Sequence, residues 1–133
     1  MFQTIIIIGN LGRDPEMRYL SNGKAVTSFS LASNRTYKSN DGQQVKETTW
    51  FRITVWGNQA ESCNQYLKKG GKVLVEGRLT PDSETGSPKV FQRKDGTWGA
   101  SYEVNAQTVR FLSSIGESND QGEELDDGGD IPF

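Results

Sequence analysis

The spacing of apolar residues along this chain of 133 residues follows a strand-like alternation and changes to a helical period only once. The β-branched run at residues 5–8 favours a strand. Further strands are predicted at residues 25–33, 45–56, 72–80 and 101–112, with a short one near residues 16–20. The Asp-Gly pairs at positions 41–42 and 95–96 are typical of hairpin turns.

The helical segment lies at residues 57–71. Asn58 is predicted to cap its N-terminus, with Glu61 completing a capping box, and Gly70 to end it in the left-handed conformation. One face of this helix carries three residues suited to a core, namely Ala60, Cys63 and Leu67.

Five main strands with one helix between the third and the fourth is the element order of the OB barrel, whose exposed face and loops bind oligonucleotides or oligosaccharides. Other small β-barrels share the strand count, but the place of the helix favours the OB fold. From Ser113 onward the sequence is acidic and glycine-rich, which is typical of disorder. The predicted fold is all-β, a five-stranded OB-fold barrel with one short helix between strands 3 and 4 and a disordered acidic C-terminal tail.

The composition argues against enzymes and metal sites. Histidine is absent and Cys63 is the single cysteine, which leaves no triad base, no internal disulfide and no all-cysteine zinc site. A phosphate-binding glycine loop and a carboxylate cluster for magnesium are also absent from the predicted domain. We predict no catalytic activity, no metal and no cofactor.

The first twelve residues, MFQTIIIIGNLG, are too short for a membrane span and lack the basic region of a signal peptide. A lone cysteine also fits a reducing compartment. We therefore predict a cytoplasmic protein with no membrane partner.

Charge divides the chain into two unlike parts. Residues 1–116 hold all 15 Lys and Arg against 10 acids, a net charge of +5, whereas residues 117–133 hold seven acids and no base. The overall pI near 5.2 is an average of these parts and does not by itself favour or exclude an anionic partner.

The strand at residues 45–56 mixes rings and cations on one face. Alternation places Phe51, Ile53 and Val55 on one side of it. The opposite side carries Lys46, Trp50, Arg52 and Trp56. Exposed rings between cations are typical of a surface that stacks nucleobases and meets phosphates. Two alternatives are an inverted register with the tryptophans in the core, and a face that binds protein.

Two loops repeat this mixture. Tyr37 lies between Arg35 and Lys38, and a second loop combines Phe91, Arg93, Lys94 and Trp98. Taken singly, each is equally compatible with an ordinary solvated hairpin. Three such mixtures in one small domain favour nucleic acid, and no recognition helix or zinc-finger spacing is present to read a duplex.

The acidic segment ends on three apolar residues. Acids alone would serve as a solubility device, which is one interpretation. Ile131, Pro132 and Phe133 instead predict a peptide ligand on a tether, with the ring and terminal carboxylate of Phe133 entering a basic pocket of a partner. Asp126, Asp127 and Asp130 would steer it there.

The stretches IIIIGNLGRDPEMRYLSNGKAVTSFSLAS and TTWFRITVWGNQAESCNQYLKKGGKVLVEGRLT, with the closing DIPF, resemble the bacterial single-stranded-DNA-binding protein family. The resemblance implies a nucleoid-associated homotetramer of OB domains around which single-stranded DNA wraps, with a tail that docks onto replication, recombination and repair proteins. By position, Trp50 and Trp56 match residues that stack bases in the family, and Tyr37 and Phe91 match further aromatic positions of it. Arg18, Arg52 and Lys69 match basic positions of the family near DNA. Phe51 stands where well-known members have an interface histidine, and residues 81–90 enlarge a loop.

These observations predict a non-catalytic protein that binds single-stranded DNA with tolerance for sequence, coats unwound strands and recruits partners. The predicted division is an OB-fold domain at residues 1–112, a short flexible linker at 113–125 and an acidic partner-binding tip at 126–133. Three alternatives are an RNA-binding or cold-shock-like module, a nuclease, and an interaction scaffold that uses the tryptophan face for protein. The acidic tail disfavours the first, and the missing histidines and carboxylates disfavour the second.

Overall fold

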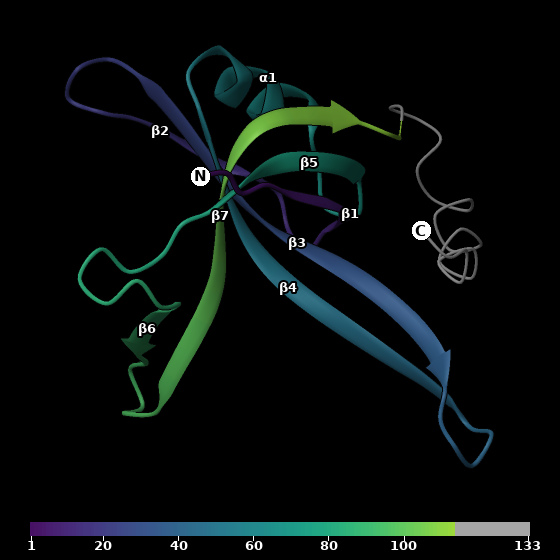
Figure 1. Ribbon diagram of the computed structural model, residues 1–133. Coiled ribbons are helices and arrows are strands. Elements are labelled where there is room, and N and C mark those ends of the chain that lie inside the picture. Colours follow the sequence, from purple (N-terminus) through teal and green to yellow (C-terminus); the bar gives the residue numbers. More distant parts are fainter. Residues whose placement is uncertain (114–133) are drawn as a thin grey trace.

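The computed structural model of the chain describes residues 1–113 (Figure 1). Its elements are β1 (Ile5–Leu11), β2 (Glu16–Tyr19), β3 (Ala25–Lys38), β4 (Gln44–Trp56), α1 (Asn58–Tyr66), β5 (Lys72–Leu79), β6 (Lys89–Gln92) and β7 (Trp98–Phe111). The predicted disordered tail, the predicted linker beyond Ser113 and the predicted tip with Asp126, Asp127, Asp130, Ile131, Pro132 and Phe133 lie outside the described residues.

Five of the strands close into a barrel in the order β1-β5-β7-β4-β3, with β3 pairing back to β1. The closing pairs are Asn10↔Ala32 and Leu11↔Leu31. The pairing of β4 with β7 is parallel, and the other pairings are antiparallel. Since α1 lies between the third and fourth barrel strands, β4 and β5, the predicted OB fold is confirmed. The short strands β2 and β6 add to β3 and β7.

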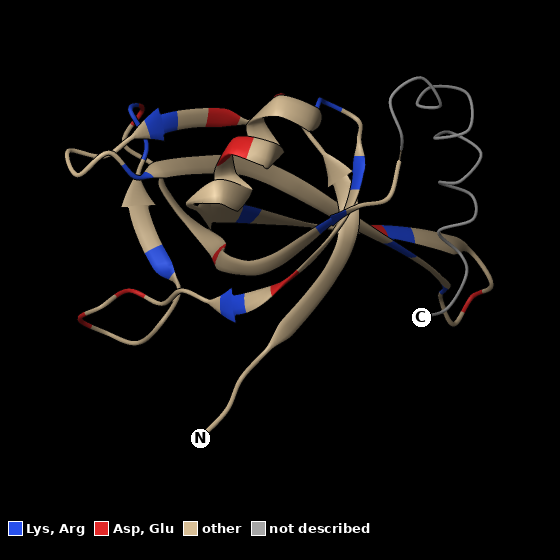
Figure 2. Ribbon diagram, turned by 90° about the horizontal axis from the view of Figure 1, so that it is seen from above, with Lys and Arg blue, Asp and Glu red and all other residues tan. Residues whose placement is uncertain are grey.

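The core fills the barrel and extends under α1, which lies across the barrel in the view from above (Figure 2). Alternate residues of each strand face inward, so the core draws on every barrel strand. Its fully covered side chains include Leu31, Ile53, Val55, Val73, Val75 and Val104. The hydroxyl of Thr27 is buried among them and donates a 2.6 Å hydrogen bond to the carbonyl oxygen of Ala60, which ties β3 to α1.

Both predicted helix ends are wrong. The N-cap is Gly57 at φ 72°, and no side chain caps the helix, so Asn58 and Glu61 form no capping box. The reason is the sharp turn after Trp56, which requires a positive φ that glycine adopts without strain. The helix ends at Tyr66, and Leu67 is already extended as the C-cap. Gly70 has φ +86° but lies in the turn beyond the helix.

The path of β7 is set by two contacts with neighbouring elements. The side-chain amide of Gln59 donates to the carbonyl oxygen of Gln107 at 2.9 Å and accepts from the backbone N–H of Val109 at 3.1 Å. The register of β5 against β7 shifts between Glu76 and Gly77. A Cβ atom on Gly77 would lie 2.1 Å from the carbonyl oxygen of Asn105, so only glycine permits this close approach.

Among the hairpins that extend from the barrel, two contain the predicted Asp-Gly turns (Figure 1). One is the β3–β4 hairpin, which pairs from Val26↔Trp56 to Lys38↔Gln44. The other is the β6–β7 hairpin, which pairs from Lys89↔Ser101 to Gln92↔Trp98. Both turns use the predicted glycines at positive φ, Gly42 and Gly96. Within residues 1–113, no helix has the length and apolar character that crossing a membrane requires.

Cys63 lies on the buried face of α1, with 1% of its surface exposed, and burial raises the pKa of its thiol from 9.0 to about 11. The unfolded thiol ionises near its ordinary pKa, so this group's contribution to stability is present below that value. It is then lost as pH rises towards the folded pKa, by about 1.4 kcal/mol per pH unit. We expect Cys63→Ala to lose less stability than the wild type between about pH 8 and pH 10.5 in urea unfolding. Parallel losses in the two proteins would contradict this.

Candidate nucleic-acid interface

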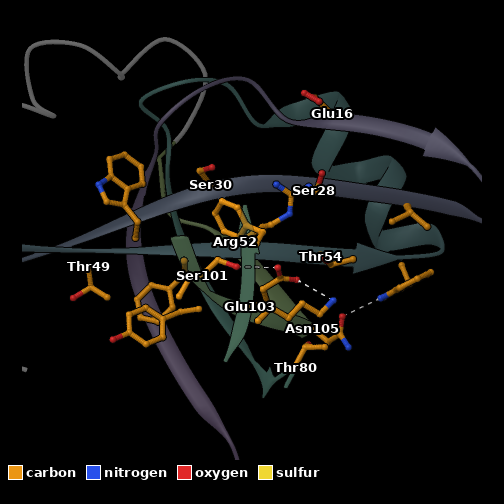
Figure 3. Close-up of a pocket in the computed structure, with 18 of the residues that line it drawn as sticks. Glu16, Ser28, Ser30, Thr49, Arg52, Thr54, Thr80, Ser101, Glu103 and Asn105 are labelled. Carbon is orange, nitrogen blue, oxygen red and sulfur yellow. Dashed lines mark hydrogen bonds and ion pairs between the residues drawn. The ribbon is translucent and has the colours of Figure 1, made fainter. Parts of the chain in front are cut away.

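An open groove of about 1290 Å³ crosses the outer face of the barrel. Its lining comes from β2, β3, β4, β6 and β7, together with Thr80 after β5. Figure 3 shows the polar side chains of this groove, with Arg52 near its centre.

The floor of the groove consists of short polar side chains around Arg52. Across the sheet, Arg52 lies between Ser30 of β3 and Glu103 of β7. Two residues along β4, Thr54 also has polar neighbours on the same two strands. Small hydroxyl-bearing side chains leave the cation accessible from the groove, because none of them is long enough to cover it.

The two tryptophans predicted to stack bases lie at the two ends of this floor. Trp50 and Trp56 line the groove, with 53% and 41% of their surfaces exposed. On the opposite face of β4, Ile53 and Val55 are fully buried. The predicted register is therefore confirmed, and the inverted register with the tryptophans in the core is excluded.

Trp50 packs over a glycine of the loop that follows β1. A Cβ atom on Gly12 would lie 2.7 Å from Cζ3 and 2.8 Å from Cη2 of the Trp50 ring. Real side-chain carbons do not approach so closely, so the absence of a side chain at Gly12 makes room for the indole. One part of the ring is thereby supported, while about half of its surface stays open to the groove.

Replacing Gly12 with alanine should displace the Trp50 ring without unfolding the barrel. The ring is the far end of a side chain and can move, and Gly12 has no positive φ that would strain alanine. We expect binding of oligo-dT to weaken by about 0.5–2 kcal/mol, part of the value of one stacked base. Fluorescence titration measures this, with thermal unfolding as the check on folding. A normal affinity in a well-folded Gly12→Ala protein would show that the ring position does not matter.

Trp56, at the other end, is held from a different strand. Its indole Nε1 donates a hydrogen bond of 3.3 Å to Oδ1 of Asn105 on β7. Its cross-strand neighbour on β3 is the buried Val26, which also lines the groove. Arg18 of β2 pairs with Val26 in turn, so this predicted cation is brought to the same end of the groove.

The β6–β7 hairpin brings one of its two predicted aromatics into the groove. Phe91 lines it, and the guanidinium of Arg93 lies 5.5 Å from the centre of the Phe91 ring. Trp98 pairs with Gln92, so alternation places it on the other face of the hairpin from Phe91, where 65% of its surface is exposed. Neither Trp98 nor Lys94 in the turn lines the groove.

The β3–β4 hairpin carries four further predicted residues outside the groove lining. The guanidinium of Arg35 lies 4.8 Å from the centre of the Tyr37 ring. The register places Lys38 and Lys46 on the strand face that Trp50 occupies, and Tyr37 and Arg35 on the opposite one. The ring at position 37 is therefore not brought together with the groove aromatics in a single chain.

Lys69 lies away from the groove, in the turn after α1. Its backbone N–H donates to the carboxylate of Asp14 at 2.8 Å, which fixes the turn, and its side chain is exposed. This residue is therefore not part of the groove lining.

Several groove residues were not predicted from the sequence. They are Met17, Thr80, Lys89, Tyr102, Glu103 and Asn105. Alternation about the buried Val104 indicates that Glu103 and Asn105 point outward, but not that β7 lies beside β4. Within residues 1–113 the hydroxyl oxygen of Thr80 is buried without a hydrogen-bond partner.

Glu103 places a negative charge beside Arg52 in the groove. Its carboxylate accepts a hydrogen bond from Ser101 at 3.0 Å and forms an ion pair with Lys89 at 3.7 Å. This carboxylate repels a phosphate and competes with it for Lys89.

Glu103→Gln should therefore tighten binding of single-stranded DNA, by about 2- to 5-fold at low salt, because a partly exposed charge pair is worth up to about 1 kcal/mol. The gain should shrink as salt screens it. Titration with oligo-dT at two salt concentrations measures the effect. Glu84→Gln, in the loop outside the groove, is the charge-matched control; an equal gain there would mean that only net charge matters.

Residues 1–113 contain no group of three or more His, Cys, Asp or Glu placed to hold a metal ion. What the groove presents instead is rings, hydroxyls, three cations and three carboxylates. These are groups that bind through stacking, hydrogen bonds and charge.

A closed barrel with a helix between its third and fourth strands, and an open groove across its sheet, defines an OB-type binding domain. A family model described as the single-strand binding protein family matches residues 2–112. The chain belongs to this family.

The similarity to individual proteins supports the same family assignment. The chain is 41% identical over 115 residues to a single-stranded DNA-binding protein of Neisseria meningitidis, covering 86% of this chain and 62% of that protein. A single-stranded DNA-binding protein of Halalkalibacterium halodurans is 35% identical over 133 residues, or 99% of this chain and 74% of that protein. Plasmodium falciparum SSB, solved as a complex with ssDNA, is 26% identical with a TM-score of 0.67, covering 85% of this chain and 96% of that chain. The chain thus spans about 62% of the length of its Neisseria relative.

Proposed function

We propose that this chain binds single-stranded DNA along the groove, with tolerance for sequence and without catalysis. The observation that carries the proposal is the pair of half-exposed indoles, Trp50 and Trp56, with Arg52 between them on one strand face. Rings receive bases of any identity, and the cation meets phosphate. Six residues of strand separate the indoles by about 20 Å, so they stack different bases.

The net positive charge of the described residues and the similarity to a relative solved with ssDNA support this proposal. The described part of the chain contains all 15 Lys and Arg, against 10 of the 17 acids. Arg18, Arg52 and Lys89 line the groove itself, together with the carboxylates of Glu16, Glu47 and Glu103. A relative of the same fold was solved with ssDNA.

The test is a fluorescence titration with oligo-dT, a matched duplex and oligo-rU at two salt concentrations. We expect oligo-dT to quench tryptophan emission, the duplex to bind much more weakly, and affinity to fall with salt as phosphate contacts release counterions. Equal binding of duplex would refute a groove for single strands. A preference for oligo-rU would favour the RNA-binding alternative, and no change in emission would favour the protein scaffold.

We propose in addition that the barrel assembles as a homotetramer, which multiplies the binding surface along one strand. What supports this, besides the family, is an apolar outer face remote from the groove. Ile6 is 60% exposed on the outer side of β1, and Ile8 lies opposite Leu74 of β5 on the same side. Light scattering at micromolar concentration should give four times the chain mass, and a monomeric mass would refute the assembly.

The tip at residues 126–133 is proposed to recruit replication, recombination and repair proteins to DNA that the domain coats in the nucleoid. Its support is the acidic run that closes on Phe133. The likeness to the Halalkalibacterium protein, which covers 99% of the chain, includes most of this segment. Deleting Phe133 should abolish capture of partners from a bacterial lysate and leave oligo-dT affinity intact. If the shortened chain captures the same proteins, the acidic segment is a solubility device.

A further inference from the structure

The hydrogen bond between Trp56 and Asn105 joins the neighbouring strands β4 and β7 in the groove (Figure 3). An indole N–H can only donate, so its partner must be the side-chain oxygen of Asn105 and not its amino group. This settles which way the amide faces: Oδ1 points to the ring. Within residues 1–113, no hydrogen bond engages the Nδ2 group of Asn105.

The acceptor is held on rigid backbone. Asn105 pairs with Thr54 of β4 on one side and with Arg78 of β5 on the other. Its carbonyl oxygen lies at the close approach to Gly77, where no side chain fits. A short side chain on such a backbone has little freedom, so Oδ1 is a well-placed anchor.

The orientation of the donor, the indole of Trp56, is by contrast not fixed by its own backbone. Trp56 is the last residue of β4, directly before the turn at Gly57, and 41% of its surface is exposed. Val26, its cross-strand neighbour on β3, does not choose among the rotations of the ring. The directional bond to Asn105 selects one orientation.

We propose that Asn105 is a positioning residue, which holds the indole of Trp56 in the orientation that receives a base. This inference rests on the proposed function, and it assigns a role to a residue that touches the ring and not the base. Fixing the ring before binding removes part of the ordering cost that stacking would otherwise carry.

The first experiment is made on the free protein. The chain has three tryptophans, so a ¹H–¹⁵N spectrum shows three indole signals, and Trp56→Phe identifies one of them. Asn105→Ala should shift that signal and speed its exchange with solvent, and leave the other two in place. Gln107→Ala, an exposed amide on the same strand outside the groove lining, is the matched control and should change none. An unmoved Trp56 signal in Asn105→Ala overturns the inference.

The second experiment is a double-mutant cycle on oligo-dT affinity. Asn105→Ala should weaken binding by about 2- to 10-fold when Trp56 is present. In the Trp56→Phe background it should have no effect, because phenylalanine has no N–H to hold. An equal loss of affinity in both backgrounds would mean that Asn105 contacts DNA directly. No loss of affinity with Trp56 present would mean that the hydrogen bond does not contribute to binding. Either result overturns the positioning role.

The two experiments also separate this inference from the proposed function. If the wild-type chain fails to bind oligo-dT, the proposed function is wrong, and the positioning role falls with it. That failure appears in the wild type and in every variant alike. A wrong positioning role instead leaves wild-type binding intact and appears only in the spectra or in the cycle.

Discussion

Replacing Trp50 and Trp56 together with alanine is expected to weaken binding of oligo-dT by roughly 2–6 kcal/mol, because each stacked base is worth about 1–3 kcal/mol. The barrel should remain folded, since both rings lie on the exposed face of β4, opposite the buried Ile53 and Val55. With the groove tryptophans removed, binding is measured by the anisotropy of a labelled oligonucleotide.

Trp98→Ala is the matched control for this double variant. Trp98 is the third tryptophan, it is 65% exposed, and it lies outside the groove lining. Its loss should change the affinity by much less than the loss of either groove tryptophan. If the double variant binds as the wild type does, or if Trp98→Ala costs as much, the groove is not the stacking surface.

Gly77→Ala should destabilise the barrel by roughly 3 kcal/mol, at the upper end of what overpacking typically costs. The added Cβ would lie 2.1 Å from the carbonyl oxygen of Asn105, and a backbone oxygen cannot swing aside as a side chain does. Urea unfolding at one protein concentration measures the loss. Because β7 must shift to relieve the clash, oligo-dT affinity should fall as well.

Gly86→Ala is the control for this substitution. Gly86 lies in the loop before β6 with φ +74° and no atom within 4 Å of an added Cβ, so alanine there meets only the strain of the left-handed conformation. That strain costs about 1–2 kcal/mol. A Gly77→Ala protein as stable as Gly86→Ala would show that β5 and β7 can separate at little cost.

The strand faces of this protein could be predicted from the sequence, because alternation depends only on the neighbouring residues. Ile53 and Val55 are buried, and Trp50 and Trp56 exposed, as the pattern of β4 indicates. The single change of period located α1 and with it the OB fold. The helix ends could not be found this way, since the turn after β4 depends on where the barrel requires the chain to go.

The contribution of β7 to the groove could not be predicted from the sequence, for a related reason. Glu103 and Asn105 reach it only because β7 lies parallel to β4, a pairing between residues about fifty positions apart. No local pattern reports such a pairing. Trp98 and Phe91 illustrate a smaller limit of prediction from the sequence. Both are aromatic residues near one turn, and only the register of the hairpin shows that they lie on opposite faces of it.

The parallel pairing of β4 with β7 also bears on folding. Residues 57–97 separate β4 from β7 in the sequence, so the groove exists only when the barrel is closed. Contacts so distant in sequence form late and slowly. A single strand that occupies the groove therefore binds the native state and not the unfolded chain, and it raises the unfolding midpoint in proportion to the logarithm of its concentration. Single-stranded DNA bound as proposed would therefore also stabilise the closed barrel.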